Sequence, residues 1–180
     1  MMPSMMPSMM PRWIRRLAIV LVAAAATASV AIAFANDVVW PRSAWHQERY
    51  RAVATYVRKH SQPADRLYVW GNSPEIYLYA QRRMASRYMS ANYQTGRVWG
   101  TPANEVGGRP DDERVPPESW THLVADFVAH PPAYIVDAAA GKLDKMDDER
   151  IERHPILRAF VARHYRIEAT VLGVPIYGRK

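Results

Sequence analysis

The sequence predicts an α/β protein with a three-layer, mostly parallel sheet and a C-terminal antiparallel hairpin, preceded by a single transmembrane helix. Three observations predict this class. A long apolar run follows arginines near the N-terminus, short strand-like runs then alternate with helical patterns, and two β-rich runs separated by a glycine close the chain. Helices that alternate with short apolar strands favour a sheet whose parallel strands are connected through helices.

Composition limits the classes of function. The chain has 180 residues, no cysteine and a formal net charge of +7. Its length suits one folded domain with short extensions. The lack of cysteine excludes disulfides, thiolate metal sites and a cysteine nucleophile. The positive charge suits anionic partners, but the arginines are scattered, and we expect no nucleic-acid partner and no cofactor.

The N-terminal part predicts a membrane segment. Residues 1–16 form a low-complexity Met/Pro/Ser tail that ends in three arginines, and residues 17–35 carry no charge. At about 1.5 Å per residue, this run nearly spans a hydrocarbon core of roughly 30 Å. Arginines before the run and Asn36-Asp37 after it predict a cytoplasmic N-terminus, with everything after Ala35 outside.

Two fates of this segment stay open. The length of the apolar run favours an uncleaved single-pass anchor in the cell membrane. The small residues of Ala33-Phe34-Ala35 instead fit a signal peptide that is cleaved near Ala35, which would leave a secreted protein. In both cases residues 36–43 are a linker, and residues 44–180 are an extracytoplasmic α/β domain.

The first elements of that domain are a helix and a strand. A helix is expected from Trp45 to His60, and its apolar face is formed by Tyr50, Val53, Ala54 and Val57. The run Leu67 to Trp70 then predicts a buried strand. Gly71-Asn72-Ser73 predicts a turn, in which Ser73 caps a short helix over Ile76 to Ala80 and Pro74 takes its first position.

The second half repeats this alternation. A helix is predicted over 118–130, a buried strand over 133–137, a helix over 155–165 and a hairpin of 166–172 with 174–177. Residues 92–117 and 138–153 predict irregular, polar loops. The residues expected on the buried sides of the two helices are Trp120, Leu123, Val124, Phe127 and Val128, and Ile156, Leu157, Phe160 and Val161.

Several stretches together resemble a known family. They are Tyr50 with Tyr56-Val57, Asp65 to Gly71, Pro74 to Tyr77, Arg82-Arg83 with Ser86-Arg87, Pro131 to Asp137, and Tyr165 with Val174 to Tyr177. In this order they resemble the C-terminal extracytoplasmic domain of bacterial GT-C type membrane glycosyltransferases. These are the protein-mannosyltransferase and aminoarabinose-transferase-like enzymes, which use polyprenyl-phosphate sugars.

The resemblance implies an accessory role more than catalysis. Members of that family carry many membrane helices, and their catalytic acid lies just after the first of them. This chain has one such segment, and Asp37 after it lacks the rest of that loop, so we interpret Asp37 as a boundary residue and expect no catalytic residue. A multi-pass membrane glycosyltransferase subunit and a polyprenyl-phosphate sugar are the implied partners.

The turn after the first strand is the candidate ligand site. If the strands ending at Gly71 and Asp137 are parallel, both ends open on the edge where such sheets bind ligands. Free amides of the turn and positive charge nearby would then hold an anion. The predicted anion-binding residues are Gly71, Asn72, Ser73, Arg82, Arg83, Arg87 and Asp137. The alternative is that Ser73 only caps a helix and Asp137 only ends a strand.

Two other patterns contain residue types that can carry chemistry. His122, Asp126 and His130 recur at helical spacing, which could bring metal ligands to one face, but a solvated helix face is the favoured interpretation and no metal is expected. The acidic runs Asp111-Asp112 and Asp147-Asp148-Glu149 are interpreted as solvated loops.

Two classes of function follow from the sequence. The first is a membrane-anchored, non-catalytic accessory domain of a glycosyltransferase system. The second is an independent envelope module that binds a ligand or scaffolds other proteins, without a role in glycosyl transfer.

Overall fold

The structure is a computed structural model that describes residues 11–34, 42–97, 115–143 and 146–180. The chain divides into two compact units, Met1–Ala44 and Trp45–Lys180. The predicted linker and Asp37, the cleavage site at Ala35 and Asp111-Asp112 lie wholly or partly outside the described residues.

The first unit contains one long helix, α1 (Arg12–Phe34). It begins earlier than the predicted apolar run and includes Trp13. Its span Trp13–Ile32 has 20 residues, a mean hydropathy of 1.7 and no buried residue within the structure. At about 1.5 Å per residue this span matches a hydrocarbon core of roughly 30 Å. The helix is therefore long and apolar enough to cross a membrane.

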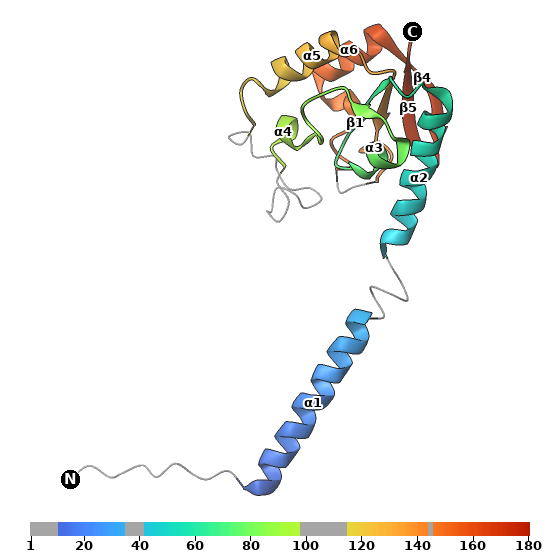
Figure 1. Ribbon diagram of the computed structural model, residues 1–180. Coiled ribbons are helices and arrows are strands. Elements are labelled where there is room, and N and C mark those ends of the chain that lie inside the picture. The colour runs from blue at the N-terminus through green and yellow to red at the C-terminus, as the bar shows by residue number, and fades with distance from the viewer. Residues whose placement is uncertain (1–10, 35–41, 98–114, 144–145) are drawn as a thin grey trace, which may run out of the picture. The chain divides into compact units, whose positions relative to one another are not determined.

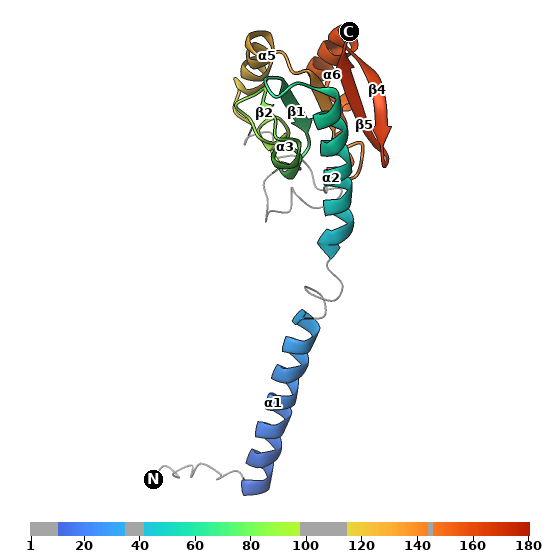
Figure 2. The same cartoon turned by 45° about the vertical axis from the view of Figure 1, so that its right-hand side comes forward.

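The second unit is built on a five-stranded sheet of order β2-β1-β3-β5-β4 (Figures 1 and 2). Its strands are β1 (Arg66–Trp70), β2 (Arg83–Met84), β3 (Tyr134–Asp137), β4 (Tyr165–Val171) and β5 (Val174–Arg179). The two runs expected to form buried strands, in β1 and β3, are confirmed. They lie side by side and parallel, with Trp70 opposite Asp137.

The sheet is mixed, so the expectation of a mostly parallel sheet fits only in part. β1 pairs in parallel with β2 and β3, whereas β5 is antiparallel to both β3 and β4. The C-terminal hairpin is confirmed, and Figure 2 shows it at one side of the sheet. Its turn places Leu172 at φ 47° and Gly173 at φ 83°, the positive values that a tight hairpin turn requires.

Helices contribute to a hydrophobic core on each face of the sheet. One core joins Leu67 and Val69 of β1 to α2 (Arg42–His60) and α3 (Glu75–Ala80). The other joins Tyr68 and Trp70 to α5 (Ser119–Ala129) and α6 (Pro155–His164). Alternate residues of one strand thus serve opposite cores, because successive strand side chains point to opposite faces.

Some local expectations were wrong. A short helix, α4 (Asn92–Thr95), begins the stretch expected to be irregular. Pro74, and not Ser73, is the N-cap residue of α3, and Pro74 itself makes no side-chain capping hydrogen bond. Val128 and Ile156 were expected to be buried but are exposed, because Leu123 and Phe127, and Leu157 and Val161, already fill the buried sides of α5 and α6.

The largest correction concerns residues 138–153, which were expected to form a solvated polar loop. Much of this segment is buried, including Ala138, Leu143, Met146, Glu149 and Ile151. It ends in the short 3-10 helix η4 (Ile151–Arg153). The segment therefore belongs to the core at the carboxyl end of β3, although its sequence is rich in charged residues.

Candidate functional site

The carboxyl ends of β1 and β3 meet at one edge of the sheet, as the sequence predicted. Gly71 follows β1 with φ 121°, and its carbonyl oxygen accepts the Ala91 N–H at 2.8 Å. Asp137, which ends β3, is fully buried. Its two carboxylate oxygens accept the Ala140 N–H at 2.8 Å and the Ile151 N–H at 3.1 Å. Asp137 thus ties the segment that follows it to the end of the sheet.

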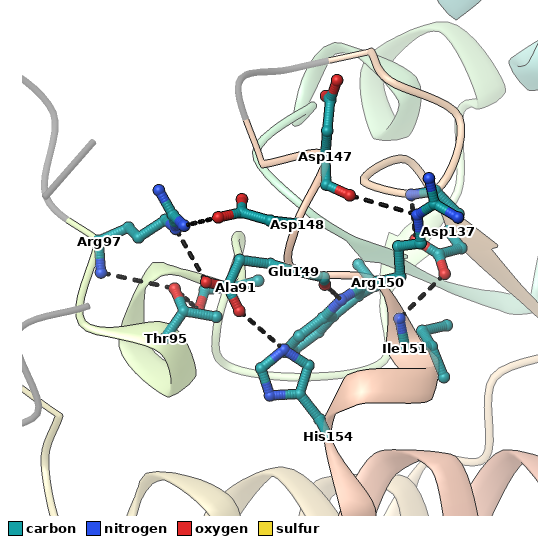
Figure 3. A network of polar contacts seen from close by, with 12 residues as sticks. Ala91, Thr95, Arg97, Asp137, Asp147, Asp148, Glu149, Arg150, Ile151 and His154 are labelled. Carbon is teal, nitrogen blue, oxygen red and sulfur yellow. Dashed lines mark hydrogen bonds and ion pairs between the residues drawn. The ribbon is translucent and has the colours of Figure 1, made fainter. Parts of the chain in front are cut away.

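A buried polar network lies at this edge and is drawn in Figure 3. Arg97 is fully buried, and its Nε donates to Glu149 Oε1 at 3.0 Å, while an Nη2 hydrogen bond reaches Asp148. The second carboxylate oxygen of Glu149 lies 3.0 Å from His154 Nε2. The Trp70 indole N–H donates to the Glu149 carbonyl oxygen. One acidic residue thus connects an arginine, a histidine and the end of β1.

Charge at this edge is balanced around Glu149. Burial raises the pKa of the Glu149 carboxyl, but the contacts with His154 and Arg97 outweigh burial and hold the pKa below its usual value. Glu149 is therefore ionised at neutral pH. It gives Arg97 a buried counter-charge, without which burial of a guanidinium would be costly.

A cavity of about 320 Å³ opens beside the network. It is lined by Gln94 and Thr95 of α4, Trp120 of α5, and Glu149, His154 and Ile156. The His154 ring packs against two tryptophans, with ring centroids 4.8 Å from Trp70 and 5.5 Å from Trp120, and these two rings also contact each other at 5.9 Å. The cavity therefore combines a partly exposed aromatic ring with several polar groups.

A second, basic pocket lies beside the amino end of β1, where Arg66 pairs with Arg83 of β2. It has a volume of about 680 Å³, and its lining includes four arginines, Arg66, Arg82, Arg83 and Arg87, with Asp126 and His130. Asp126 is the one acidic side chain among the described residues that line it. Such an excess of guanidinium groups around one depression favours an anionic ligand.

The arginines of this basic pocket have different partners. Arg82 is buried, and its guanidinium donates to the Arg58 and Ser61 carbonyl oxygens at the end of α2. It therefore satisfies carbonyl groups that the end of a helix leaves without partners. Arg83 is exposed, and within the described part of the chain its side chain makes no hydrogen bond or ion pair.

Arg87 is held at the pocket by Asp126. Two guanidinium nitrogens of Arg87 contact the carboxylate, the shortest at 2.8 Å. Burial raises the pKa of the Asp126 carboxyl, but the hydrogen bonds from Arg87 and Ser86 outweigh it and lower the pKa. The contact pre-positions Arg87 at the rim, with half of its side chain exposed to solvent.

The predicted anion-binding residues therefore fall into two groups. Gly71, Asn72, Ser73 and Asp137 lie at the carboxyl edge of β1 and β3, whereas the three arginines line the basic pocket near the amino end of β1. The fold does not bring all seven of these residues together into one site. Anion binding by either group stays a prediction.

His122 and Asp126, which share helical spacing with His130, contact other protein side chains. Asp126 faces Arg87, and His122 Nδ1 lies 3.1 Å from the Tyr88 hydroxyl. Among the described residues, no group of three His, Asp or Glu side chains is placed to hold a metal ion.

Sequence reasoning missed Arg97, Glu149 and His154. Arg97 lies in the stretch interpreted as an irregular loop, and Glu149 lies in the acidic run interpreted as solvated. The available signal was the position of that acidic run between apolar Met146 and Ile151, both of which are buried. This signal does not name a partner for the acidic residue.

Comparisons of the chain with models of known protein families, with curated proteins and with solved structures gave no match.

Proposed function

We propose that this protein is a membrane-anchored, non-catalytic domain that binds the phosphate group of an anionic ligand outside the cytoplasm. The observation that carries the proposal is the basic pocket, in which four arginines and one carboxylate surround a volume of about 680 Å³. Phosphate groups suit such a pocket because guanidinium groups donate paired, charge-assisted hydrogen bonds to their oxygens.

Two arginines would make direct contact with the ligand. Arg83 is exposed and has no partner among the described residues, so its donors are available. Arg87 is already positioned by Asp126, and its exposed half can turn to a phosphate oxygen. Arg82 donates from Nε to the Ser61 hydroxyl and from its other two nitrogens to backbone carbonyl oxygens, so it contributes positive charge from behind the pocket.

The role in the membrane rests on α1 and on the resemblance of the chain to the C-terminal domain of membrane glycosyltransferases. A segment of apolar residues long enough to cross a bilayer precedes the domain. The arginines before it favour a cytoplasmic N-terminus, and the domain would then face the periplasm or the exterior. The ligand class that fits both features is a polyprenyl-phosphate sugar, and the role is accessory to a multi-pass membrane transferase.

The ligand claim can be tested by calorimetry on the full chain in detergent micelles. The probe is farnesyl phosphate, a short polyprenyl phosphate, and farnesol is the matched ligand without the phosphate. Binding of farnesyl phosphate but not farnesol is expected. Arg83→Ala should weaken it about tenfold, the effect of losing a charge-assisted hydrogen bond.

The control variant is Arg166→Ala, which removes an exposed arginine of β4 outside the basic pocket. It changes the net charge by the same amount as Arg83→Ala. Comparison of the two variants therefore distinguishes a local contact from general electrostatic attraction of the ligand. Equal weakening by both substitutions, or equal heats from farnesyl phosphate and farnesol, would contradict the proposal.

The accessory role is tested separately by purifying the tagged full chain from its native membrane in mild detergent. Co-purification of a multi-pass membrane protein, whose sugar transfer to its acceptor falls when Arg83 is replaced by alanine, supports the accessory role. Transfer that is indifferent to this substitution favours the independent envelope module.

A further inference from the structure

A third pocket, of about 370 Å³, lies where the carboxyl ends of α5, α6 and β5 come together (Figure 1). We call it the α5–α6 pocket. It shares no lining residue with the basic pocket or with the cavity beside Glu149. The described residues that line it are apolar or basic, and none of them is acidic. Its chemistry therefore differs from that of both sites described above.

Aromatic rings form the inner wall of this pocket. The Phe160 ring centroid lies 5.1 Å from that of Phe127, 6.0 Å from that of Tyr165 and 4.8 Å from that of His164. Phe127 and Tyr165 are 1% and 3% exposed, whereas Phe160 is partly exposed. The accessible edge of an aromatic cluster suits another aromatic ring, because ring pairs interact favourably beyond the burial of apolar area.

Two further apolar side chains line the pocket and reach solvent. Val128 is 71% exposed, and Pro131 is also exposed. Single exposed apolar residues are common on protein surfaces, but these two lie beside a hollow that has an aromatic wall. They would lose contact with water if an apolar side chain entered the pocket, and burial of their surface would stabilise the complex.

Three cationic side chains of arginine and lysine line the pocket, and two of them are available to an occupant. Lys180 Nζ donates to the Ala162 carbonyl oxygen at 2.7 Å, so Lys180 satisfies a carbonyl group near the end of α6. Arg163 and Arg179 are exposed, and within the described part of the chain their side chains make no hydrogen bond or ion pair. Two such guanidinium groups, with no acidic side chain in the described lining, favour an anionic occupant.

Shape and charge together favour a segment of another protein as this occupant. A second copy of the chain has the same net charge of +7, so like charges would meet. The flat surface of a bilayer does not reach a recessed wall, in which Phe127 and Tyr165 are almost fully buried. A single aromatic side chain can enter the recess while its acidic neighbours stay at the rim. Protein interfaces commonly bury such an aromatic anchor within a polar rim.

We propose that the α5–α6 pocket is a docking site for an acidic segment of a partner protein that carries an aromatic anchor. The anchor packs against Phe160 and Val128. Carboxylates next to it in the partner pair with Arg163 and Arg179. This docking does not depend on phosphate binding in the basic pocket.

The experiment is saturation-transfer NMR on the full chain in nanodiscs of phosphatidylcholine. The probe is a five-residue peptide with a central phenylalanine and four glutamates, acetylated and amidated at its ends. Two matched peptides replace the phenylalanine by alanine or all four glutamates by lysine. Saturation transfer is expected to the phenylalanine ring protons of the acidic peptide, with a dissociation constant in the millimolar range because a short peptide makes few contacts. The alanine and lysine peptides should bind at least tenfold more weakly.

Substitution of the two arginines tests the charge contacts. The double variant Arg163→Gln/Arg179→Gln should bind the acidic peptide about tenfold more weakly, the combined effect of losing two exposed ion pairs. The control is Arg158→Gln/Arg166→Gln, which removes the same charge at two exposed positions outside the pocket. It should weaken binding by less than about twofold. Circular dichroism checks that both variants are folded.

Substitution of an exposed valine tests the apolar contact. Val128→Ala removes two methyl groups from the rim and should weaken binding about threefold, the effect of partial loss of their burial. Leu78→Ala is the matched control, because Leu78 is 72% exposed on α3 and lies outside the pocket. It should leave the dissociation constant unchanged.

Four results would overturn the proposal. They are an absence of saturation transfer to the acidic peptide, equal binding of the lysine peptide, unchanged binding in a folded Arg163→Gln/Arg179→Gln variant, and loss of peptide binding when phosphatidylglycerol is added to the nanodiscs. The last result would mean that anionic lipid occupies the pocket. Arg83→Ala should not affect this assay, so the docking site and the phosphate site can fail independently.

Discussion

Arg97 and Glu149, which lie 52 residues apart in the chain, form a buried ion pair with 3.0 Å between Nε and Oε1. Arg97 is fully buried, and Glu149 keeps only 9% of its side chain exposed. The pair joins the end of α4 to the segment before η4. It therefore fixes two loops at the carboxyl end of the sheet.

The first prediction concerns this pair. Glu149→Gln should lower the free energy of unfolding by about 3 kcal/mol, because it leaves a buried guanidinium with less counter-charge. Asp148 continues to contact Arg97, so the domain should still fold. Urea denaturation followed by tryptophan fluorescence measures the change. Asp147→Asn, a neighbouring and more exposed carboxylate, is the control and should change stability by less than about 0.5 kcal/mol.

The pH dependence of stability provides a second prediction. The pKa of Glu149 and the pKa of Asp126 are both lower in the folded protein than their usual values of 4.5 and 3.8. Lowered carboxyl pKa values stabilise the fold above the unfolded pKa, and this contribution disappears as the pH falls through the folded pKa. The free energy of unfolding should therefore decrease as the pH falls below about 4.5.

Substitution of Glu149 isolates its contribution to the pH dependence of the free energy of unfolding. Glu149→Gln should show a smaller loss of stability between neutral and acidic pH than the wild type, because its titrating group is gone. Denaturant titrations at a series of pH values measure both slopes. If the two proteins lost stability in parallel, Glu149 would not be linked to folding in the way the geometry implies.

Close packing at Gly141 gives a third prediction. A Cβ at this position would lie 2.6 Å from Val174 Cγ2 and 3.1 Å from the Val174 Cα atom. Val174 is fully buried, so it cannot move aside freely. Gly141→Ala should destabilise the domain by about 1–3 kcal/mol, the usual cost of overpacking a core.

A compensating substitution tests the cause of that effect. Val174→Ala removes the methyl groups that the new Cβ would meet. In the double variant the loss should be smaller than the sum of the two single losses, by about 1 kcal/mol. Strict additivity would mean that the clash with the Val174 methyl group is not the cause.

The fourth prediction concerns Arg49, which connects α2 to two turns. Its Nη2 donates to the Gly141 carbonyl oxygen and to the Leu172 carbonyl oxygen, the latter at 2.8 Å. Arg49→Met keeps much of the side-chain length but leaves these carbonyl groups without their donor. A loss of about 2 kcal/mol in the free energy of unfolding is expected. Arg58→Met, on the same helix but exposed, is the control and should have little effect.

Much of the fold could be predicted from local pattern, but the order of the sheet could not. The apolar runs of β1 and β3 are bounded by turn residues, so their strands are visible in the sequence. The hairpin pattern shows that β4 pairs with β5, but not that β5 also pairs with β3 and so makes the sheet mixed. β2 has two residues, which is too short for any periodic signal.

The candidate sites, like the order of the sheet, could be predicted only in part from the sequence. Arg82 and Arg83 are adjacent and chemically identical in the sequence, yet one caps the end of α2 and the other is exposed. Arg97 and Glu149 meet only through the fold, because no local pattern connects residues so far apart. The sequence pointed to Arg82, Arg83 and Arg87 but not to Arg97 or Glu149, and tertiary contacts decided which of the arginines are available to a ligand.

The most direct test of the central claim is to record the arginine Nε–Hε NMR signals of the full chain while inorganic phosphate is added. Substitutions to lysine assign the signals of Arg83, Arg87 and Arg166. The account predicts saturable shifts for Arg83 and Arg87, and none for Arg166, which lies outside the basic pocket. Equal shifts for all three arginines, or shifts confined to arginines outside the pocket, would contradict phosphate binding at this site.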